Sequence, residues 1–125
     1  MKMLLNLIFL SFIIICFSFI SLDDVISGIK KGDAAEVSKY FDNTIEITLP
    51  DKSNSYSKSQ AELVLRDFFN TNSIKDFEVL QRGDNDAGSQ YCTGSLQTKN
   101  GIFRTTIFLK QKGDKQLLKE LRFER

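Results

Sequence analysis

Apolar residues fill almost all of the first twenty positions of the chain, whereas apolar and polar positions alternate through the remainder. Met1 and Lys2 are followed by an apolar run over residues 3–20 that only three polar residues interrupt. One positive charge before an apolar stretch, with small residues after it, is typical of a secretory signal. We therefore expect residues 1–21 to be a signal peptide and the protein to be exported, either periplasmic or secreted.

Two alternatives for this segment follow from its length and its cysteine. The apolar run is near the lower limit for a membrane span, so an uncleaved segment would tether the protein to the membrane. Cleavage after Ser18 would place the small residues Cys16 and Ser18 at the positions read by signal peptidase. Lipidation of Cys16 fits less well, because the bulky Ile15 stands where a small residue is needed. Contact with a membrane is expected only through this segment, and only if it is not cleaved.

Two short helices are expected after the signal. Apolar residues recur at helical spacing from Leu22 to Ile29, and Gly32 is expected to end this first helix. Asp33, with Glu36 three residues later, forms a capping box that predicts the start of a second helix. Both helices would precede the first strand of the domain.

A strand and a long helix follow. Alternation of apolar and polar residues predicts a strand over residues 44–49, ended by Pro50, and residues 51–54 are expected to form a turn. Ser57 begins another capping box, which opens a helix over about residues 58–71. The apolar residues of this helix lie three and four positions apart, the spacing of a core-packing face: Ala61, Val64, Leu65, Phe68 and Phe69.

The last part of the chain is predicted to be β-structure. Four strands are expected, over residues 77–80, 90–99, 102–111 and 116–123. The dipeptide Asn100-Gly101 between the second and third of them is the strongest short-range hairpin signal available. A two-residue loop at this dipeptide would pair Thr98 with Phe103, and the side chains of these two residues would face the helices.

The final hairpin completes the expected architecture. A three-residue loop around Gly113 would place Ile107 opposite Leu121 and keep the apolar face of the sheet continuous. Helix, helix, strand, helix and four strands in that order predict an α+β domain, with the helices packed on one face of a curved antiparallel sheet. A long sheet that curls around a long helix leaves a cone-like hollow, which we expect as the place for a ligand.

Several stretches of the chain carry a family resemblance: residues 38–50 (SKYFDNTIEITLP), residues 55–61 (SYSKSQA), Asp67-Phe68-Phe69, Arg104 after the Asn100-Gly101 turn, and Glu120-Leu121-Arg122-Phe123. Over residues 22–124 the chain resembles an uncharacterised family of small exported bacterial proteins, a domain of unknown function. That family is similar in fold to nuclear transport factor 2, the cystatin-like cone. The resemblance implies a single domain over residues 22–125 and carries no activity, so no catalytic residue transfers. The wider superfold includes ketosteroid isomerases, scytalone dehydratases, polyketide cyclases and many non-enzymes, and the fold alone does not choose among them.

Composition excludes several classes of function. Seventeen basic residues stand against sixteen acidic ones, and this near balance argues against a nucleic-acid partner. The chain has no histidine, which excludes Ser-His-Asp and Cys-His catalysis and the usual zinc sites. Isolated glycines without a phosphate-binding arrangement give no support for a nucleotide cofactor. We therefore expect neither a metal nor a cofactor. Cys92 is the single cysteine after the signal and is expected to be a buried small hydrophobe.

Five residues are candidates for a polar cavity or its rim. An isomerase-type site needs a carboxylate base and a tyrosine donor, for which Glu46, Tyr56 and Tyr91 are available. Each has a simpler interpretation, Glu46 as an exposed strand residue and Tyr56 as a core or rim aromatic. Arg104 and Arg122 lie on adjacent predicted strands near Glu120, where they would form either a polar floor to the hollow or a cross-strand ladder of ion pairs.

Three functions remain open on the sequence alone. The first is a non-catalytic binding module for a small apolar ligand or a protein partner, which agrees with export, an expected hollow and the missing catalytic residues. A hollow filled by the protein's own phenylalanines would weaken the ligand version. The second is an isomerase or dehydratase that uses a cavity carboxylate with a tyrosine. The third is a structural or assembly protein that forms a homodimer through the open face of its sheet.

Overall fold

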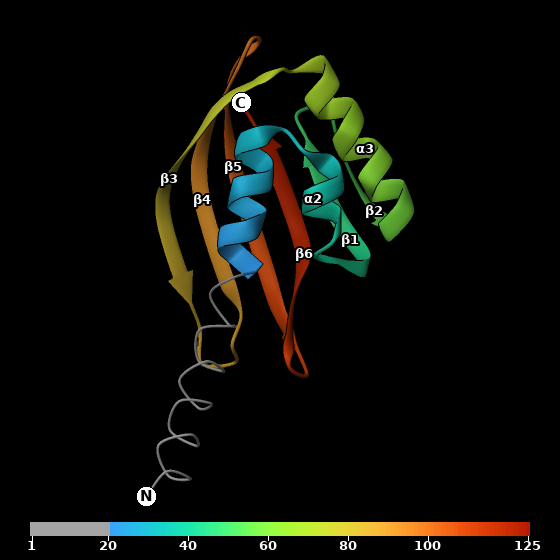
Figure 1. Cartoon of the computed structure of the whole chain (residues 1–125), viewed down its shortest axis with the longest axis vertical. Helices are drawn as coiled ribbons and strands as arrows, with labels where there is room; N and C mark the ends of the chain where they lie inside the picture. Colours follow the sequence, from blue (N-terminus) through green and yellow to red (C-terminus); the bar gives the residue numbers. More distant parts are fainter. Residues whose placement is uncertain (1–20) are drawn as a thin grey trace, which may run out of the picture.

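The computed structural model describes residues 21–125, so the predicted signal peptide lies outside the described residues except for Ser21 (Figure 1). Residues 21–31 are helical, and the remaining elements are α2 (Ala34–Ser38), β1 (Phe41–Leu49), β2 (Lys52–Ser57), α3 (Lys58–Thr71), β3 (Ile74–Asp84), β4 (Gln90–Thr98), β5 (Gly101–Lys112) and β6 (Lys115–Glu124). Within residues 21–125 no helix has both the length and the apolar character needed to cross a membrane.

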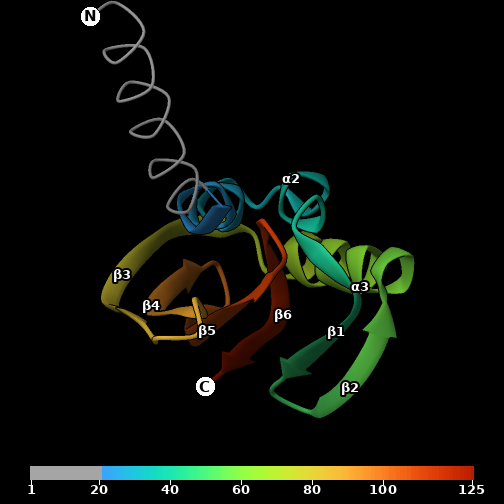
Figure 2. The same ribbon diagram turned by 90° about the horizontal axis from the view of Figure 1, so that it is seen from below.

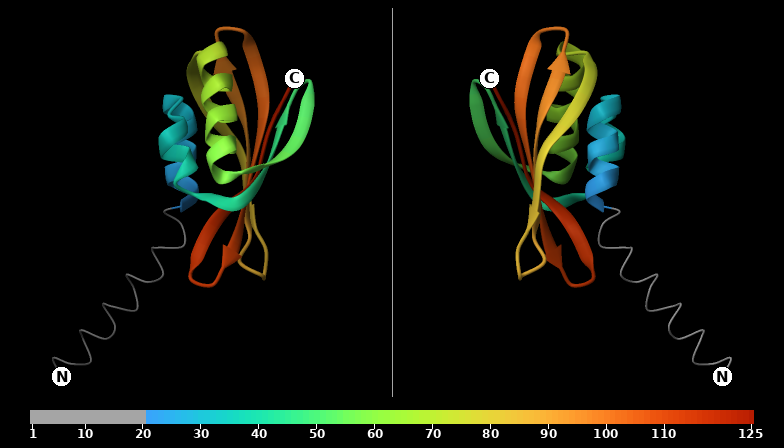
Figure 3. Two further views of the ribbon diagram at one scale, coloured as in Figure 1. Left: turned by 90° about the vertical axis from the view of Figure 1, so that its right-hand side faces the viewer. Right: turned by 90° about the vertical axis from the view of Figure 1, so that its left-hand side faces the viewer.

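The six strands form one curved sheet in the order β2-β1-β6-β5-β4-β3. Helix 21–31, α2 and α3 all lie on the same side of this sheet (Figures 2 and 3). This arrangement confirms the predicted α+β class with helices on one face. We call the helix-covered side the inner face of the sheet and the opposite side the outer face.

The helix boundaries follow from local caps, as predicted. Gly32 ends the first helix at a φ of 66°, and its N–H donates to the carbonyl of Ile29 over 3.0 Å. The Asp33 carboxylate accepts the backbone N–H of Glu36 at the start of α2. At the start of α3 the Ser57 hydroxyl likewise accepts a backbone N–H three residues along the chain.

The expected turn at residues 51–54 is wrong. Only Pro50 and Asp51 form the turn, and the chain returns as β2, which pairs antiparallel with β1 from Leu49 opposite Lys52 onwards. The segment Lys52–Ser57 escaped prediction because it is polar throughout and only Tyr56 within it is half-buried. A strand exposed on both faces has no apolar alternation to reveal it.

The expected all-antiparallel sheet also needs correction, because β1 and β6 pair in parallel. Ile47 lies opposite Leu121, and the N–H of Leu118 donates to the carbonyl of Tyr40 over 2.6 Å just before β1 begins. The two strands lie more than sixty residues apart in the chain. Hairpin signals connect only sequence neighbours, so they carry no information about this pairing.

The β4–β5 hairpin is present, but its register differs by two residues from the predicted one. Thr98 pairs with Gly101 instead of Phe103, so Lys99 and Asn100 occupy the turn. Among the described residues only glycines have positive φ, and Gly101 has a φ of 109°. A type I′ turn needs positive φ at both central residues, which Lys99 and Asn100 do not adopt. A shift of two leaves every side chain on its predicted face.

The last hairpin pairs Ile107 with Leu121, as predicted, although by a different route. Its turn contains two residues, with Lys112 opposite Lys115, one fewer than predicted. A bulge between Phe108 and Leu109 shifts the pairing by one residue, which restores the predicted register beyond it. The apolar inner face therefore stays continuous from β4 to β6.

The helices and the inner face enclose one aromatic core. Phe68 of α3 stacks on Phe123 of β6, with ring centroids 4.3 Å apart, and meets Phe103 of β5 edge to face at 5.3 Å. Phe69 adds an edge contact to Phe123 at 6.4 Å. Cys92 is fully buried in the same core, as predicted, and burial raises the pKa of its thiol.

Candidate functional site

The space beneath α3 is occupied by side chains. Four phenylalanines from the helix and the sheet meet there, and each is no more than 6% exposed: Phe68, Phe69, Phe103 and Phe123. Where the curvature of the sheet led us to expect a hollow, these rings pack against one another. Any functional surface must therefore be sought outside this part of the core.

The predicted carboxylate and tyrosine of an isomerase-type site are not brought together. Glu46 is exposed on the outer face, where the hydroxyl of Ser53 lies 3.4 Å from its Oε1. Tyr56 lies opposite the buried Ile45 and therefore on the inner side, half-buried against the core. Its hydroxyl accepts a hydrogen bond of 3.4 Å from Nδ2 of Asn54.

Arg104 and Arg122 lie on the outer face, not on the floor of a hollow. Arg122 forms ion pairs with Glu120 at 3.5 Å and with Glu124 at 3.4 Å, all three on β6. Arg104 lies opposite Glu124 on the neighbouring strand and is exposed. The ion pairs that form thus run along one strand, and at this exposure each contributes well below about 1 kcal/mol.

Tyr91 also lies on the outer face. Its ring covers the backbone of Gly83 on β3, where a Cβ would overlap the ring atoms. On the other side it lies opposite Phe108 of β5. Next to this aromatic pair, Thr93 and Thr106 pair across the same strands.

Thr106 in turn lies opposite Arg122. We call these five neighbouring residues the outer patch: Tyr91, Thr93, Thr106, Phe108 and Arg122. Tyr91 and Arg122 were expected at a cavity or its rim, but both lie on the outer face of the sheet. The alternation of β4 around buried Cys92 was the signal that places Tyr91 outside.

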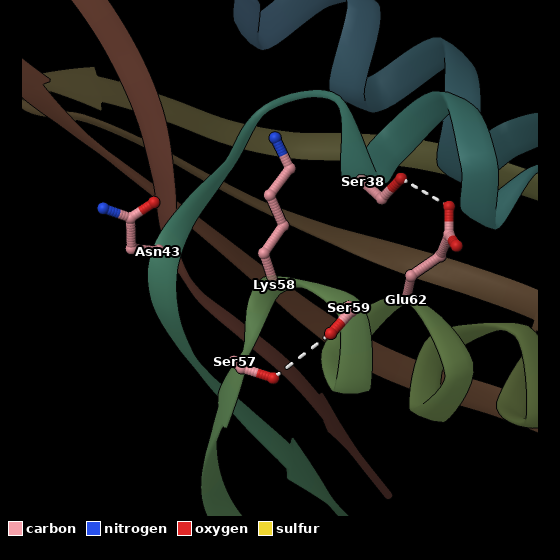
Figure 4. Close-up of a pocket in the computed structure, with 6 residues that line it drawn as sticks. All are labelled: Ser38, Asn43, Ser57, Lys58, Ser59 and Glu62. Atoms are coloured by element: carbon pink, nitrogen blue, oxygen red, sulfur yellow. Dashed lines mark hydrogen bonds between the residues drawn. The ribbon is translucent and has the colours of Figure 1, made fainter.

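A polar cleft of about 500 Å³ lies between the end of α2 and the first turn of α3 (Figure 4). It is lined by Ser38, Asn43, Ser57, Lys58, Ser59 and Glu62. The Ser38 hydroxyl donates to Oε1 of Glu62 over 2.8 Å, and the hydroxyls of Ser57 and Ser59 lie 3.5 Å apart. Lys58 reaches across the opening, as Figure 4 shows.

Lys58 and Glu62 are the one cation and the one carboxylate among the residues that line this cleft. The Glu62–Ser38 hydrogen bond connects α3 to α2, so it has a structural role as it stands. The capping pattern predicts the role of Ser57, whereas no local pattern predicts the contact between Ser38 and Glu62, which lie 24 residues apart.

The most buried carboxylate in the described chain belongs to Asp42, at 3% side-chain exposure. Nζ of Lys112 lies 3.0 Å from its Oδ1 and 2.9 Å from its Oδ2, and Nζ of Lys119 lies 3.6 Å from Oδ2. The backbone N–H of Asn43 donates to Oδ1 over 2.7 Å. The hydrogen bond from Lys112 lowers the pKa of Asp42 against the opposing effect of burial. Because both lysines belong to the β5–β6 hairpin, Asp42 fastens that hairpin to the start of β1.

The described residues contain no group of acidic or cysteine side chains that could hold a metal ion. Asp84 ends β3, and Asn85 and Asp86 begin the loop that leads to β4. Oδ1 of Asn85 accepts the backbone N–H groups of Ala87 and Ser89, each over 3.0 Å. We take the outer patch and the polar cleft as the two candidate functional surfaces.

Comparisons with known proteins agree with this fold. Solved DUF4783 family proteins from Bacteroides ovatus and Bacteroides uniformis are similar to this chain at 30% and 28% identity, with TM-scores of 0.78 and 0.79. Each match covers 82% of this chain, and it covers 92% and 94% of those chains respectively.

An NTF2-like protein of unknown function from Cytophaga hutchinsonii shares the fold alone, at 6% identity and a TM-score of 0.62, with 85% of this chain and 87% of that chain covered. No curated protein matches the chain. A family model described as "Domain of unknown function (DUF4783)" matches residues 22–124. The chain therefore belongs to the DUF4783 family, a domain of unknown function with a fold like that of nuclear transport factor 2.

Proposed function

We propose that this protein is an exported, non-catalytic binding module whose partner is another polypeptide, held on the outer face of the sheet. The observation that carries the proposal is the aromatic filling of the space under α3. Phe68, Phe103 and Phe123 occupy the position in which a cone-shaped domain would hold a small apolar ligand. Of the two versions of a binding module, this packing favours the protein partner.

The composition of the outer patch supports a protein partner. Tyrosine, phenylalanine and arginine are enriched at protein interfaces, whereas lysine is depleted. The outer patch has all three enriched types and no lysine. Tyr91 remains 37% exposed although its ring already covers Gly83. The two threonines of the patch add short, rigid side chains that lose little rotamer freedom on binding.

The arrangement of candidate residues argues against the isomerase alternative. A base and a donor must reach one substrate, yet Glu46 lies on the outer face and Tyr56 on the inner side. Glu120 lies opposite Phe108 beside the outer patch, but its carboxylate is ion-paired with Arg122 at 3.5 Å. The aromatic, hydroxyl and guanidinium groups of the outer patch are suited to contacts with the surface of a protein partner, and they provide no acid–base pair for catalysis.

Photo-crosslinking in the native cells tests the proposal. A photoreactive amino acid replaces Tyr91 in one variant and Leu63 in a control variant. Leu63 is 61% exposed on α3, on the opposite side of the molecule. We expect a discrete protein adduct from position 91, lost when Arg122→Glu is added, and none from position 63. Equal adducts from both positions would contradict the proposal, as would a small molecule released from the native protein on unfolding.

A further inference from the structure

We propose that the free edge of β2 pairs with the same edge of a second copy of this chain, so that two sheets continue as one across a two-fold axis. The proposal concerns an edge of the sheet and goes beyond the function proposed for its outer face. It assigns β2, the strand that sequence analysis missed, a role in self-association.

Over residues 53–57 the β2 edge lacks the charges, prolines and bulges that usually prevent edge pairing. β2 is the last strand of the sheet, and its register with β1 runs unbroken from Thr44 opposite Ser57 to Leu49 opposite Lys52. Residues 53–57 read S-N-S-Y-S, without charge and without proline. Proteins normally protect an exposed edge with charges, prolines or bulges, because its unpaired N–H and C=O groups can bind another strand.

The opposite edge of the sheet, β3, has these protections. Its register with β4 is broken by two irregularities, and charged residues follow one another along it. Two of the charges are bound to helix 21–31, Asp76 by Lys30 at 3.5 Å and Arg82 by Asp23 at 2.7 Å. The same molecule thus protects one edge and leaves the other open, which points to β2 as the pairing edge.

The β1–β2 turn determines which backbone groups are available. Leu49 and Lys52 close a two-residue turn, and such a closing pair exchanges both of its hydrogen bonds. Hydrogen-bonded and open pairs alternate along the ladder, so Ser53, Ser55 and Ser57 direct their N–H and C=O groups toward the free edge.

A second β2 strand matches this pattern when Ser55 lies on the two-fold axis. Ser55 then pairs with the partner's Ser55, and Ser53 with the partner's Ser57. Asn54 faces the partner's Tyr56, a combination that already meets within one chain at 3.4 Å. Cross-strand hydroxyl pairs stabilise antiparallel strands, and within residues 53–57 no like charges oppose each other. Lys52 meets the partner's Lys58 at each end of the contact, where both side chains are exposed, and this like-charge pair weakens the dimer.

The short strand limits the strength of this contact. A six-residue edge buries far less than the roughly 1,200 Å² of a stable interface, so we expect a weak dimer that forms as concentration rises. The two-fold axis stands perpendicular to the sheet, so both outer patches face the same side of the dimer. A partner on the outer face would then meet two copies of the patch.

Cysteine crosslinking tests the register. The full-length chain carries Cys16→Ser, and Cys92 is fully buried and remains in place. Ser55→Cys places a thiol on the axis, opposite its own copy, at the Cα separation of about 5.5 Å that a disulfide requires. Ser53→Cys, the matched control, places the two thiols four residues apart along the strand, about 13 Å. We expect covalent dimer from Ser55→Cys and almost none from Ser53→Cys; equal crosslinking of both variants, or of neither, overturns the proposal.

Light scattering against concentration provides the second measurement. Ser55→Pro removes an N–H that points to the free edge and leaves the bonds to β1 intact, so the variant is expected to fold. The unmodified protein should approach twice its monomer mass at high concentration, and Ser55→Pro should stay at the monomer mass. A chain that is monomeric throughout overturns the proposal. A dimer that persists in Ser55→Pro also overturns it, because the contact then lies elsewhere.

Discussion

Phe68 of α3 lies stacked on Phe123 of β6, with ring centroids 4.3 Å apart and ring planes at 24°. This contact joins the longest helix to the strand that holds the two halves of the sheet together, since β6 pairs with both β1 and β5. The contact also fills the space in which the curvature of the sheet predicted a hollow. This aromatic pair therefore both stabilises the domain and occupies the space in which a ligand was expected.

Phe68→Ala is expected to lower the free energy of unfolding by about 3–5 kcal/mol, the usual cost of removing a buried aromatic side chain. Chemical denaturation followed by circular dichroism measures the change. Leu63→Ala on the exposed side of the same helix is the control and should change stability by less than about 0.5 kcal/mol. A loss below about 1 kcal/mol for Phe68→Ala would mean that the rings are not packed as described.

Asp42→Asn is expected to lower the free energy of unfolding at neutral pH by about 1–2 kcal/mol. The substitution removes the negative charge that Lys112 and Lys119 bind. The lysines are half exposed, so solvent screens part of the interaction. Lys112→Met should have a similar effect. Lys110→Met removes a lysine of the same hairpin that has no contact with Asp42, and it should leave stability unchanged.

The contribution of Asp42 is expected to disappear in acid. Its pKa is lowered in the folded protein, so the unfolded chain binds more protons at low pH and stability rises with pH through this window. The difference between the natural chain and Asp42→Asn should be complete at neutral pH and shrink as the pH falls below about 4. Denaturation curves at a series of pH values measure it, and a difference that stays constant into acid would disprove the role of the charge.

Tyr40 is expected to ionise only in strong alkali. Burial and the hydrogen bond to Oδ2 of Asp24, over 2.5 Å, raise the pKa of Tyr40 to about 12. Because the folded pKa is raised, this contribution to stability is present below about pH 10 and is lost as the pH rises through about 12. Tyrosinate absorbance should therefore show a component near pH 12 that Tyr40→Phe lacks. Superimposable titrations of the two proteins would refute it.

The β4–β5 turn shows how far local sequence signals reach. Asn100-Gly101 predicted a hairpin, and the hairpin is there, but Nδ2 of Asn100 donates to the carbonyl of Thr71 and to Oδ1 of Asn72, each over 2.9 Å. These bonds join the turn to the end of α3, so a contact 28 or more residues away stabilises this register. The prediction that Thr98 and Phe103 face the helices is confirmed, because a register shift of two leaves each side chain on its face.

The site was less predictable than the fold for the same reason. Caps and alternation are local, so α3 and β5 could be read from the sequence. The parallel pairing of β1 with β6, the polar edge strand β2 and the Asp42–Lys112 ion pair depend on segments far apart in the chain. Residue types identified Tyr91 and Arg122 as candidates, but their common position on the outer face required the folded sheet.

Asn100→Ala tests the tertiary origin of that register. Losing both hydrogen bonds to the end of α3 should lower stability by about 1–2 kcal/mol. Asn70→Ala, an exposed position in the last turn of α3, serves as the control and should have almost no effect. If Asn100→Ala leaves stability unchanged, the turn is determined locally and our account of the register is wrong.

Export predicts a shortened chain in the native cells. If the apolar run over residues 3–20 is a cleaved signal, the mature protein lacks the first 18 to 21 residues, and its intact mass measured under denaturing conditions identifies the cut. Ser18→Phe places a bulky side chain at the expected cleavage position and should leave the precursor uncut. Residues 21–31 are helical, and the buried Leu22 and Val25 among them must remain in the mature chain to complete the core. A full-length mass in the envelope fraction would instead identify an uncleaved anchor, and would place the outer patch and the β2 edge beside a membrane.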